Sequence, residues 1–262
     1  MSRTRLRRAL SARDHADAAI VPLLERHAAR LEQLSDAHWL GDAEAQARLH
    51  RNAQRLYDVD AVAIGAEGLI PAIASWITAS PGLAAIKARD AVLAGTPLPS
   101  LLQPASVAEA SNIAIVRDAI RRLRTVIAER AGIAIVLPDA AALAEQLGVP
   151  QATDWAGDVL TEVIRSLGAE EPDLLLLLGT EPIVDGTIES LAEFFGIAAL
   201  SIGAAAPAGA VILSAADFSA LDENRELPAG WIYTTASEIE PASDPQRVKS
   251  AIGLLRTRGK KL

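Results

Sequence analysis

Arg26 and Arg30 are the side chains whose spacing most directly indicates chemistry. They flank His27 within residues 25–31, which follow the apolar run 18–24. Residues four apart share one helix face, so two guanidinium groups there can grip a ligand through bidentate bonds to its carboxylates. An arginine in the first turn of a helix also opposes the helix dipole, which favours an anionic partner. Two interpretations stay open: a carboxylate clamp with His27 beside it, or an ordinary solvated helix face.

Other polar side chains directly follow later apolar runs. Glu67 lies between apolar neighbours and is either an acid with a perturbed pKa or a solvated loop carboxylate. Asp139 is expected first as the N-cap or first-turn acid of a helix, and second as part of a ligand site. Further candidates of this kind are Glu181, Asp185, Ser237 and Glu238. If the strands are parallel, these side chains surround a ligand site at the carboxyl ends of the strands.

The residue types exclude or disfavour several kinds of site. Cysteine is absent, which removes disulfides, thiolate nucleophiles and zinc sites with thiolate ligands. The four histidines, at 15, 27, 38 and 50, match no compact metal-ligand spacing, so we expect them on polar faces and expect no metal or cofactor. The motifs G-x-G-x-x-G, G-x-x-x-x-G-K-[ST] and G-x-S-x-G are missing, so nucleotide binding and a serine nucleophile elbow have little support.

Charge and hydropathy narrow the range of partners. The formal net charge is −8, and apart from residues 3–8 (RTRLRR) there is no basic stripe suited to neutralise a run of phosphates, so nucleic acid is not an expected partner. Charged residues soon after that stretch argue against a signal peptide. The longest uncharged stretch, residues 68–86, contains two prolines and several hydroxyl residues, and we interpret it as a loop and a buried helix rather than a membrane span. We therefore expect a cytoplasmic protein.

Apolar runs along the chain predict seven buried parallel strands. They cover residues 18–23, 59–65, 132–138, 173–179, 197–203, 209–214 and 230–235. Helical patterns lie between most of them, notably at 42–57 and at 106–130, the latter with Ser106 as its cap. On the first of these helices one side is predicted to carry Ala45, Leu49, Ala53 and Leu56.

This alternation predicts an α/β protein whose residues 1–262 form one domain. Seven strands in this length fit a (β/α)8 TIM-type barrel slightly better than an open doubly wound sheet. With 262 residues, half of them apolar, the chain can bury one large core. No apolar run clearly predicts an eighth strand. It lies at 69–77, or after Ser214, or the barrel is incomplete.

Four segments resemble one family in their order along the chain. Residues 26–31 (RHAARL) keep both arginines of its R-Q-A-G-R-Y segment, and residues 59–69 (VDAVAIGAEGL) are similar to L-D-A-A-I-L-F-S-D-I-L. Residues 139–144 are a weaker version of a G-x-P-x-T-L-A turn. Residues 229–252 are similar to its closing segment, with Ile239, Pro241, Pro245 and Val248 in place. The chain thus resembles a short, divergent member of the superfamily of uroporphyrinogen decarboxylase and the cobalamin-independent methionine synthase-like proteins.

That resemblance implies a cofactor-free carboxy-lyase that acts on a polycarboxylated, porphyrinogen-like anionic molecule. Arg26, Arg30, His27, Asp139 and Ser237 would then bind substrate, and Glu67 would be catalytic by stabilising a cationic, ring-protonated intermediate. Glu67 replaces the family's aspartate, Ser237 replaces a histidine, and the chain is shorter than is usual. The alternatives are a methyltransferase associated with a corrinoid protein but without a zinc–thiolate site, and a non-catalytic ligand-binding or partner subunit. The resemblance also implies a homodimer.

Overall fold

A computed structural model describes residues 2–13, 18–65, 94–95, 102–179, 186–203 and 206–258. Several predictions fall outside these ranges and stay predictions. They concern the catalytic role of Glu67, the loop acids Glu181 and Asp185, a strand at 69–77, and the interpretation of residues 68–86.

All seven predicted strands are confirmed. They are β1 (Ala19–Val21), β2 (Ala61–Ile64), β3 (Gly132–Pro138), β4 (Leu174–Leu178), β5 (Ala198–Ile202), β6 (Ala210–Leu213) and β7 (Ile232–Thr235). The short apolar runs form strands because β-branched and leucine side chains pack well on a sheet that is covered on both faces. Between Ser214 and Trp231 the described chain forms a helix and loops, so no eighth strand lies there.

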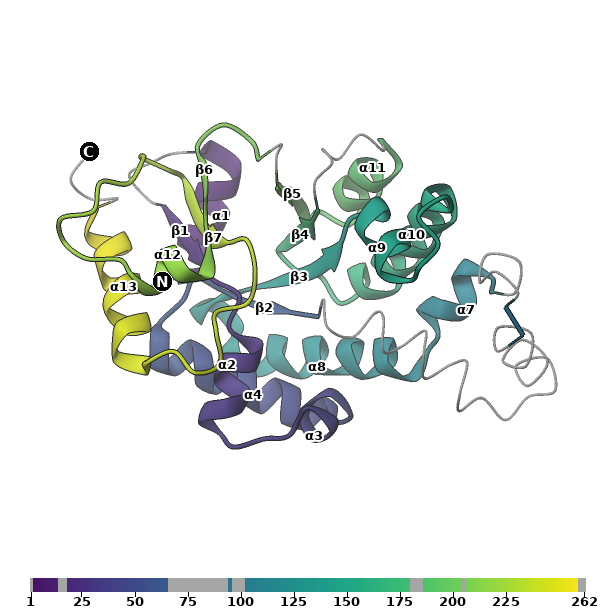
Figure 1. The fold of residues 1–262 in the computed structure, drawn as a ribbon, viewed down its shortest axis with the longest axis horizontal. Coiled ribbons are helices and arrows are strands. Elements are labelled where there is room, and N and C mark those ends of the chain that lie inside the picture. The colour runs from purple at the N-terminus through teal and green to yellow at the C-terminus, as the bar shows by residue number, and fades with distance from the viewer. Residues whose placement is uncertain are drawn as a thin grey trace.

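Every strand pair is parallel. One sheet has the order β6-β7-β1 and the other the order β2-β3-β4-β5. The two sheets meet between β1 and β2, where the Asp60 amide donates to the carbonyl of Ile20. The strands therefore follow one another in the order β6-β7-β1-β2-β3-β4-β5, with β6 and β5 as the two outer strands (Figure 1). Within the described residues no ladder joins β5 to β6, so the α/β class is confirmed and the closed barrel is not.

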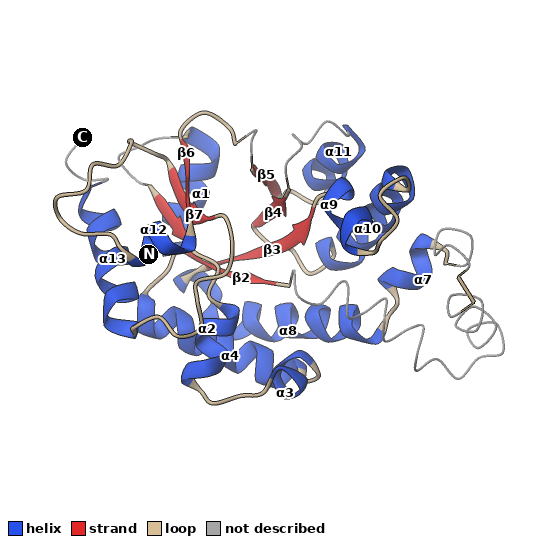
Figure 2. Ribbon diagram, viewed as in Figure 1, coloured by secondary structure: helices blue, strands red, loops and turns tan. Residues whose placement is uncertain are grey.

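The described helices lie mostly on the outer side of the strands (Figure 2). They are α1 (Ser2–Ala12), α2 (Glu25–Leu31), α3 (Asp36–Leu40), α4 (Ala43–Tyr57), α7 (Pro104–Ala108), α8 (Ser111–Ile127), the 3-10 turn η3 (Ala128–Arg130), α9 (Ala140–Gln146), α10 (Thr153–Gly168), α11 (Gly186–Phe194), α12 (Ala215–Ser219) and α13 (Pro245–Arg258).

Two predictions about these helices need correction. The helix predicted over 106–130 is interrupted, because α7 ends at Ala108 and α8 begins at Ser111; Ser106 therefore lies inside α7 and caps nothing. The helix predicted over 42–57 is present as α4, and Asp42 caps it by accepting from the Glu44 amide. Three of its four predicted core residues are buried, but Leu56 is 42% exposed.

Alternate residues of each strand pack on opposite sides and build two cores. Side chains such as Ile20, Val62 and Ile135 face the surrounding helices. The other set lies inside the curved sheet, where Leu6, Ala9 and Leu10 of α1 join the inner residues of β1 to β5 and β7. Helix α1 therefore fills the interior from the amino ends of the strands, and Leu6 packs so closely on β3 that a Cβ at Gly132 would overlap its methyl group.

Candidate functional site

Helix α2 carries the arginine pair that the sequence singles out. Arg26 and Arg30 are both exposed, and Arg30 donates to the carbonyl of Pro241 at 3.2 Å, in the segment that follows β7. His27 is fully buried and therefore does not share their exposed face. The pair thus lies on a helix that directly follows β1 and touches the segment after β7, near the carboxyl ends of two adjacent strands.

His27 is buried between α2, α4 and the segment after β7. Its Nε2 lies 2.6 Å from the Tyr57 hydroxyl. Burial lowers the pKa of His27, the carbonyls of Pro241 and Glu240 partly offset this, and Arg30 lowers the pKa further. Burial, with the nearby charge of Asp244, raises the pKa of Tyr57 to about 12. Both side chains are therefore neutral near pH 7, and together they form a polar link between two helices.

Glu25 is a polar residue that sequence reasoning missed. Its side chain is 3% exposed, and its Oε1 accepts from the Gly65 amide at 3.1 Å. The Nε2 atom of His50, itself buried, lies 3.2 Å from the same oxygen. The prediction that the histidines lie on polar faces is therefore wrong for His27 and His50. One signal was available: Gln46, His50 and Gln54 repeat every four residues, and all three are buried on α4.

Asp139 follows β3 and caps α9, as its first interpretation predicted. Its Oδ1 accepts from the Ala142 amide at 2.7 Å, and its own amide donates to the carbonyl of Leu178. The carboxylate packs against Gly179, at the end of β4, so closely that any Cβ there would overlap it. Asp139 is thus a buried acid at the carboxyl ends of β3 and β4.

Ser237 and Glu238 lie after the carboxyl end of β7. Ser237 is exposed and Glu238 is half-buried. The next residue, Ile239, donates its amide to the carbonyl of Leu23, which joins this segment to the residues between β1 and α2. The side chains predicted from the sequence therefore follow β1, β3 and β7, while Glu67, expected after β2, lies outside the described residues.

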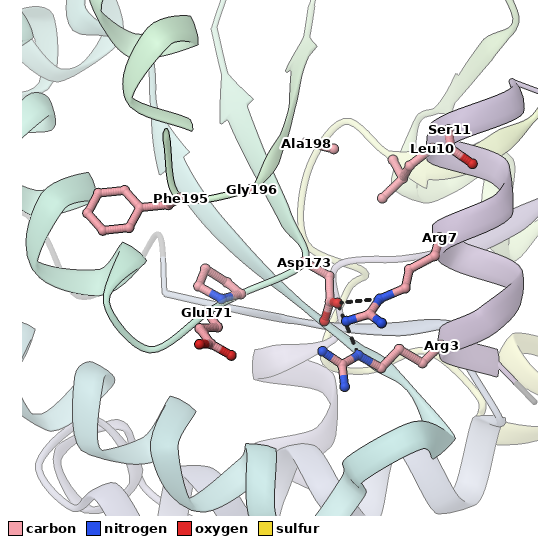
Figure 3. Close-up of a pocket in the computed structure, with 10 residues that line it drawn as sticks. Arg3, Arg7, Leu10, Ser11, Glu171, Asp173, Phe195, Gly196 and Ala198 are labelled. Atoms are coloured by element: carbon pink, nitrogen blue, oxygen red, sulfur yellow. Dashed lines mark hydrogen bonds and ion pairs between the residues drawn. The ribbon is translucent and has the colours of Figure 1, made fainter. Parts of the chain in front are cut away.

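A second polar cluster lies at the opposite end, at the amino ends of the strands. Asp173, just before β4, accepts from Arg3 Nε and Arg124 Nη1 at 3.0 Å each, and from Arg7 Nε at 3.3 Å (Figure 3). Asp60, just before β2, accepts from Arg5 Nη1 at 2.9 Å. The basic stretch near the N-terminus thus supplies cations to two buried carboxylates.

The two aspartates differ in their electrostatics. Burial alone would raise the pKa of Asp173, but Arg124, the Ile133 amide and Arg3 together hold it below its usual range. At Asp60 burial prevails over Arg256 and Arg5, so its pKa is raised.

A cavity of about 510 Å³ lies beside this cluster, lined in part by Arg3, Arg7, Asp173 and Phe195 (Figure 3). Because both of these arginines already bind Asp173, an anion in the cavity would compete with a buried carboxylate. In (β/α)8 barrels active sites lie at the carboxyl ends of the strands, and the amino ends serve stability.

Within the described ranges no group of three or more histidine and acidic side chains could hold a metal ion, and no helix is long and apolar enough to cross a membrane. No protein-family model matches the chain, and no curated protein matches its sequence.

Its fold, however, is shared. The solved structure of a methyltransferase from Methanosarcina mazei is similar over 98% of both chains, with a TM-score of 0.62 and 12% sequence identity. At that identity the likeness defines the fold: an α/β protein of parallel strands. Such a fold fits the resemblance drawn from the sequence without confirming the family. The comparison gives no support to decarboxylase activity, to a porphyrin ligand or to a homodimer.

Proposed function

We propose that the protein is methyltransferase-like and binds an anionic small molecule at the carboxyl ends of its strands, in association with a corrinoid. The single observation that supports this most is the likeness to the methyltransferase along nearly the whole of both chains. A fold alone does not define an activity, so the proposal also rests on the polar side chains at the expected end of the strands.

The chain's own residues limit the chemistry they can supply. Without cysteine the protein offers no thiolate as methyl acceptor or zinc ligand, so any thiolate acceptor must come from a substrate or a partner protein. Arg26 and Arg30, exposed on one helix, are suited to hold carboxylate or phosphate groups of that ligand. Their role is to bind and orient.

The test is calorimetric titration with cobalamin and, separately, with uroporphyrin. The critical variant is Arg26→Ala/Arg30→Ala. Arg51→Ala/Arg55→Ala is the matched control, because it removes two arginines four apart from α4 and makes the same change in net charge. Saturable cobalamin binding that only the critical variant weakens would support the proposal.

Two other results would contradict it. Binding of uroporphyrin but not of cobalamin would favour the carboxy-lyase prediction over the methyltransferase-like one. Binding of neither, or binding that both double variants change equally, would leave the arginines as a solvated helix face and the fold as the only established likeness.

A further inference from the structure

A groove of about 640 Å³ lies between the ends of α4 and α8, at the amino ends of β2 and β3. It is lined by Gln54, Arg55 and Asp58 at the end of α4, by residues 126–130 at the end of α8 and in η3, and by Ser2 of α1. Pockets for small molecules typically have volumes of about 300–1,000 Å³. The groove is therefore large enough for a small organic molecule, and it lies at the opposite end of the strands from Arg26 and Arg30.

Part of the groove wall is apolar. Val126 is 44% exposed, and the side chain beside it in sequence, Ile127, is buried. The chain turns sharply at Ala128, where φ is 43°, and residues on both sides of this turn line the groove. Backbone strain of this kind tends to occur where a ligand is held. The wall therefore offers an apolar surface on which the body of a ligand can pack.

Gln54 is a buried polar group without a protein partner. It is only 5% exposed, and its side-chain amide forms no hydrogen bond with any described residue. Burying an amide in this state is unfavourable unless something else satisfies it. Because the amide can both donate and accept, it suits a polar group of a molecule bound in the groove.

Two cations of the groove are also without partners. Arg55 and Arg130 are exposed, and neither forms an ion pair or a side-chain hydrogen bond with a described residue. This separates the groove from the cavity beside Asp173, whose arginines already bind a buried carboxylate. An anion in the groove would displace nothing.

The carboxylates of the groove do not cancel these cations, because both are already paired. Asp58 lies 3.3 Å from Arg256 Nη1, and Glu129 accepts from Arg3 Nη1 at 2.9 Å. Their side chains are also 70% and 60% exposed, so solvent screens their charge. The charge that is free to meet a ligand in the groove is therefore positive.

We propose that this groove is a second ligand site, which takes a small amphipathic anion: a flat apolar body that carries a carboxylate. The body packs on Val126 and Ile127. The planar guanidinium groups of Arg55 and Arg130 are suited both to bind the carboxylate and to stack on the body, and Gln54 supplies a neutral polar contact. This inference goes beyond the proposed function and does not depend on it.

Calorimetric titration with 1-naphthoate tests the chemistry of the site. The matched probe is 1-naphthylmethylamine, which has the same rings but carries a positive charge. We expect saturable binding of naphthoate and on the order of tenfold weaker binding of the amine, because the free cations attract one and repel the other. Absence of saturable naphthoate binding, or equal affinity for both probes, would overturn the proposal.

Variants of Arg130 test the location of the site. Arg130→Gln should weaken naphthoate binding on the order of tenfold, because it removes a charge-assisted hydrogen bond. Arg165→Gln is the matched control, since Arg165 is an exposed arginine of α10 that pairs with Glu162 and does not line the groove. Equal effects of the two variants, or no effect of Arg130→Gln, would contradict the assignment.

Gln54→Leu separates a ligand-binding role from a structural one. Leucine removes a buried amide that has no protein partner, so the melting temperature should stay unchanged or rise. Naphthoate affinity should nevertheless fall several-fold, by about the value of one neutral hydrogen bond. A lower melting temperature with unchanged affinity would show that Gln54 serves the fold and would overturn its role in binding.

The two ends of the strands should respond to different variants. Arg51→Ala/Arg55→Ala should weaken naphthoate binding and leave cobalamin binding unchanged, whereas Arg26→Ala/Arg30→Ala should leave naphthoate binding unchanged. If Arg26→Ala/Arg30→Ala weakens naphthoate binding instead, the anion binds at the carboxyl ends and the groove is not its site. Failure of the protein to bind cobalamin would refute the proposed function and leave the naphthoate result as it stands.

Discussion

Asp173→Asn is the substitution for which the structure predicts the largest loss of stability. The Asp173 side chain is 4% exposed, and it accepts from Arg3, Arg124 and the Ile133 amide at 3.0 Å each. Asparagine keeps one oxygen, which can satisfy the amide, but it removes the charge that balances two largely buried guanidinium groups. Arg7, which is 58% exposed, contributes little because solvent screens it.

Breaking a buried ion pair by removing one partner costs about 3–5 kcal/mol. For a chain of this size each kcal/mol corresponds to roughly 2–4 °C in the melting temperature. We therefore expect the melting temperature of Asp173→Asn to fall by on the order of 10 °C, measured by calorimetry and checked by urea denaturation. Asp118→Asn is the control, because Asp118 pairs with Arg122 at 2.9 Å on an exposed helix face and should change nothing measurable.

Acid pH provides an independent check of the same reasoning. The folded-state pKa of Asp173 is lowered, so its contribution is complete above the unfolded-state pKa of about 3.9 and is lost as the pH falls through the lower folded value. The gap in stability between the wild type and Asp173→Asn should therefore close at acid pH. Asp60, with a raised pKa, makes the opposite contribution, so Asp60→Asn should cost less than Asp173→Asn at pH 7. Equal losses in these two variants, or an Asp173→Asn loss no greater than that of the surface control, would refute this account.

Three further perturbations have defined outcomes. Gly179→Ala should lower stability by about 2–4 kcal/mol through overlap with Asp139 and loss of the helix cap, and adding Asp139→Ala should restore part of it in urea denaturation. Ala128→Gly should raise stability by about 1 kcal/mol, because Ala128 has a φ of 43° and glycine relieves that strain; an unchanged urea midpoint would contradict this. Since the folded-state pKa of His27 is lowered, stability should fall as the pH drops below about 6.5, and His27→Gln should lack that slope between pH 7.5 and 5.5.

Local patterns allowed the strands and most helices to be predicted. Seven short apolar runs became seven strands because burial on both faces selects the same residue types at every position. Asp139 was predicted as a cap from its place before a helical pattern, and it caps α9. The break near Ala110 was missed because apolar periodicity continues across it. Leu56 was misplaced because the residues buried at this end of α4 are Ala53, Gln54 and Tyr57.

The polar interior depends on contacts that are distant in sequence. The partners of Arg5 and Arg3 lie 55 and 170 residues away, so the basic stretch could not be recognised as a set of buried ion pairs. Glu25 and Gly65 are 40 residues apart, and their contact requires the strand order to be known. The arginine pair on α2, by contrast, was visible from its spacing alone.

The two buried aspartates also support placing the proposed ligand site at the carboxyl ends of the strands. Asp60 and Asp173 repeat one arrangement: each accepts from the amide of an isoleucine 40 residues earlier, in the preceding strand, and each also binds an arginine of α1. Arginines of α1 at the amino ends of the strands thus neutralise the two aspartates, and their ion pairs hold α1 against the interior of the sheet. An anion bound there would have to displace a carboxylate and leave it buried without its cations, which is costly. Arg26 and Arg30 instead lie on an exposed helix face near the carboxyl ends of the strands.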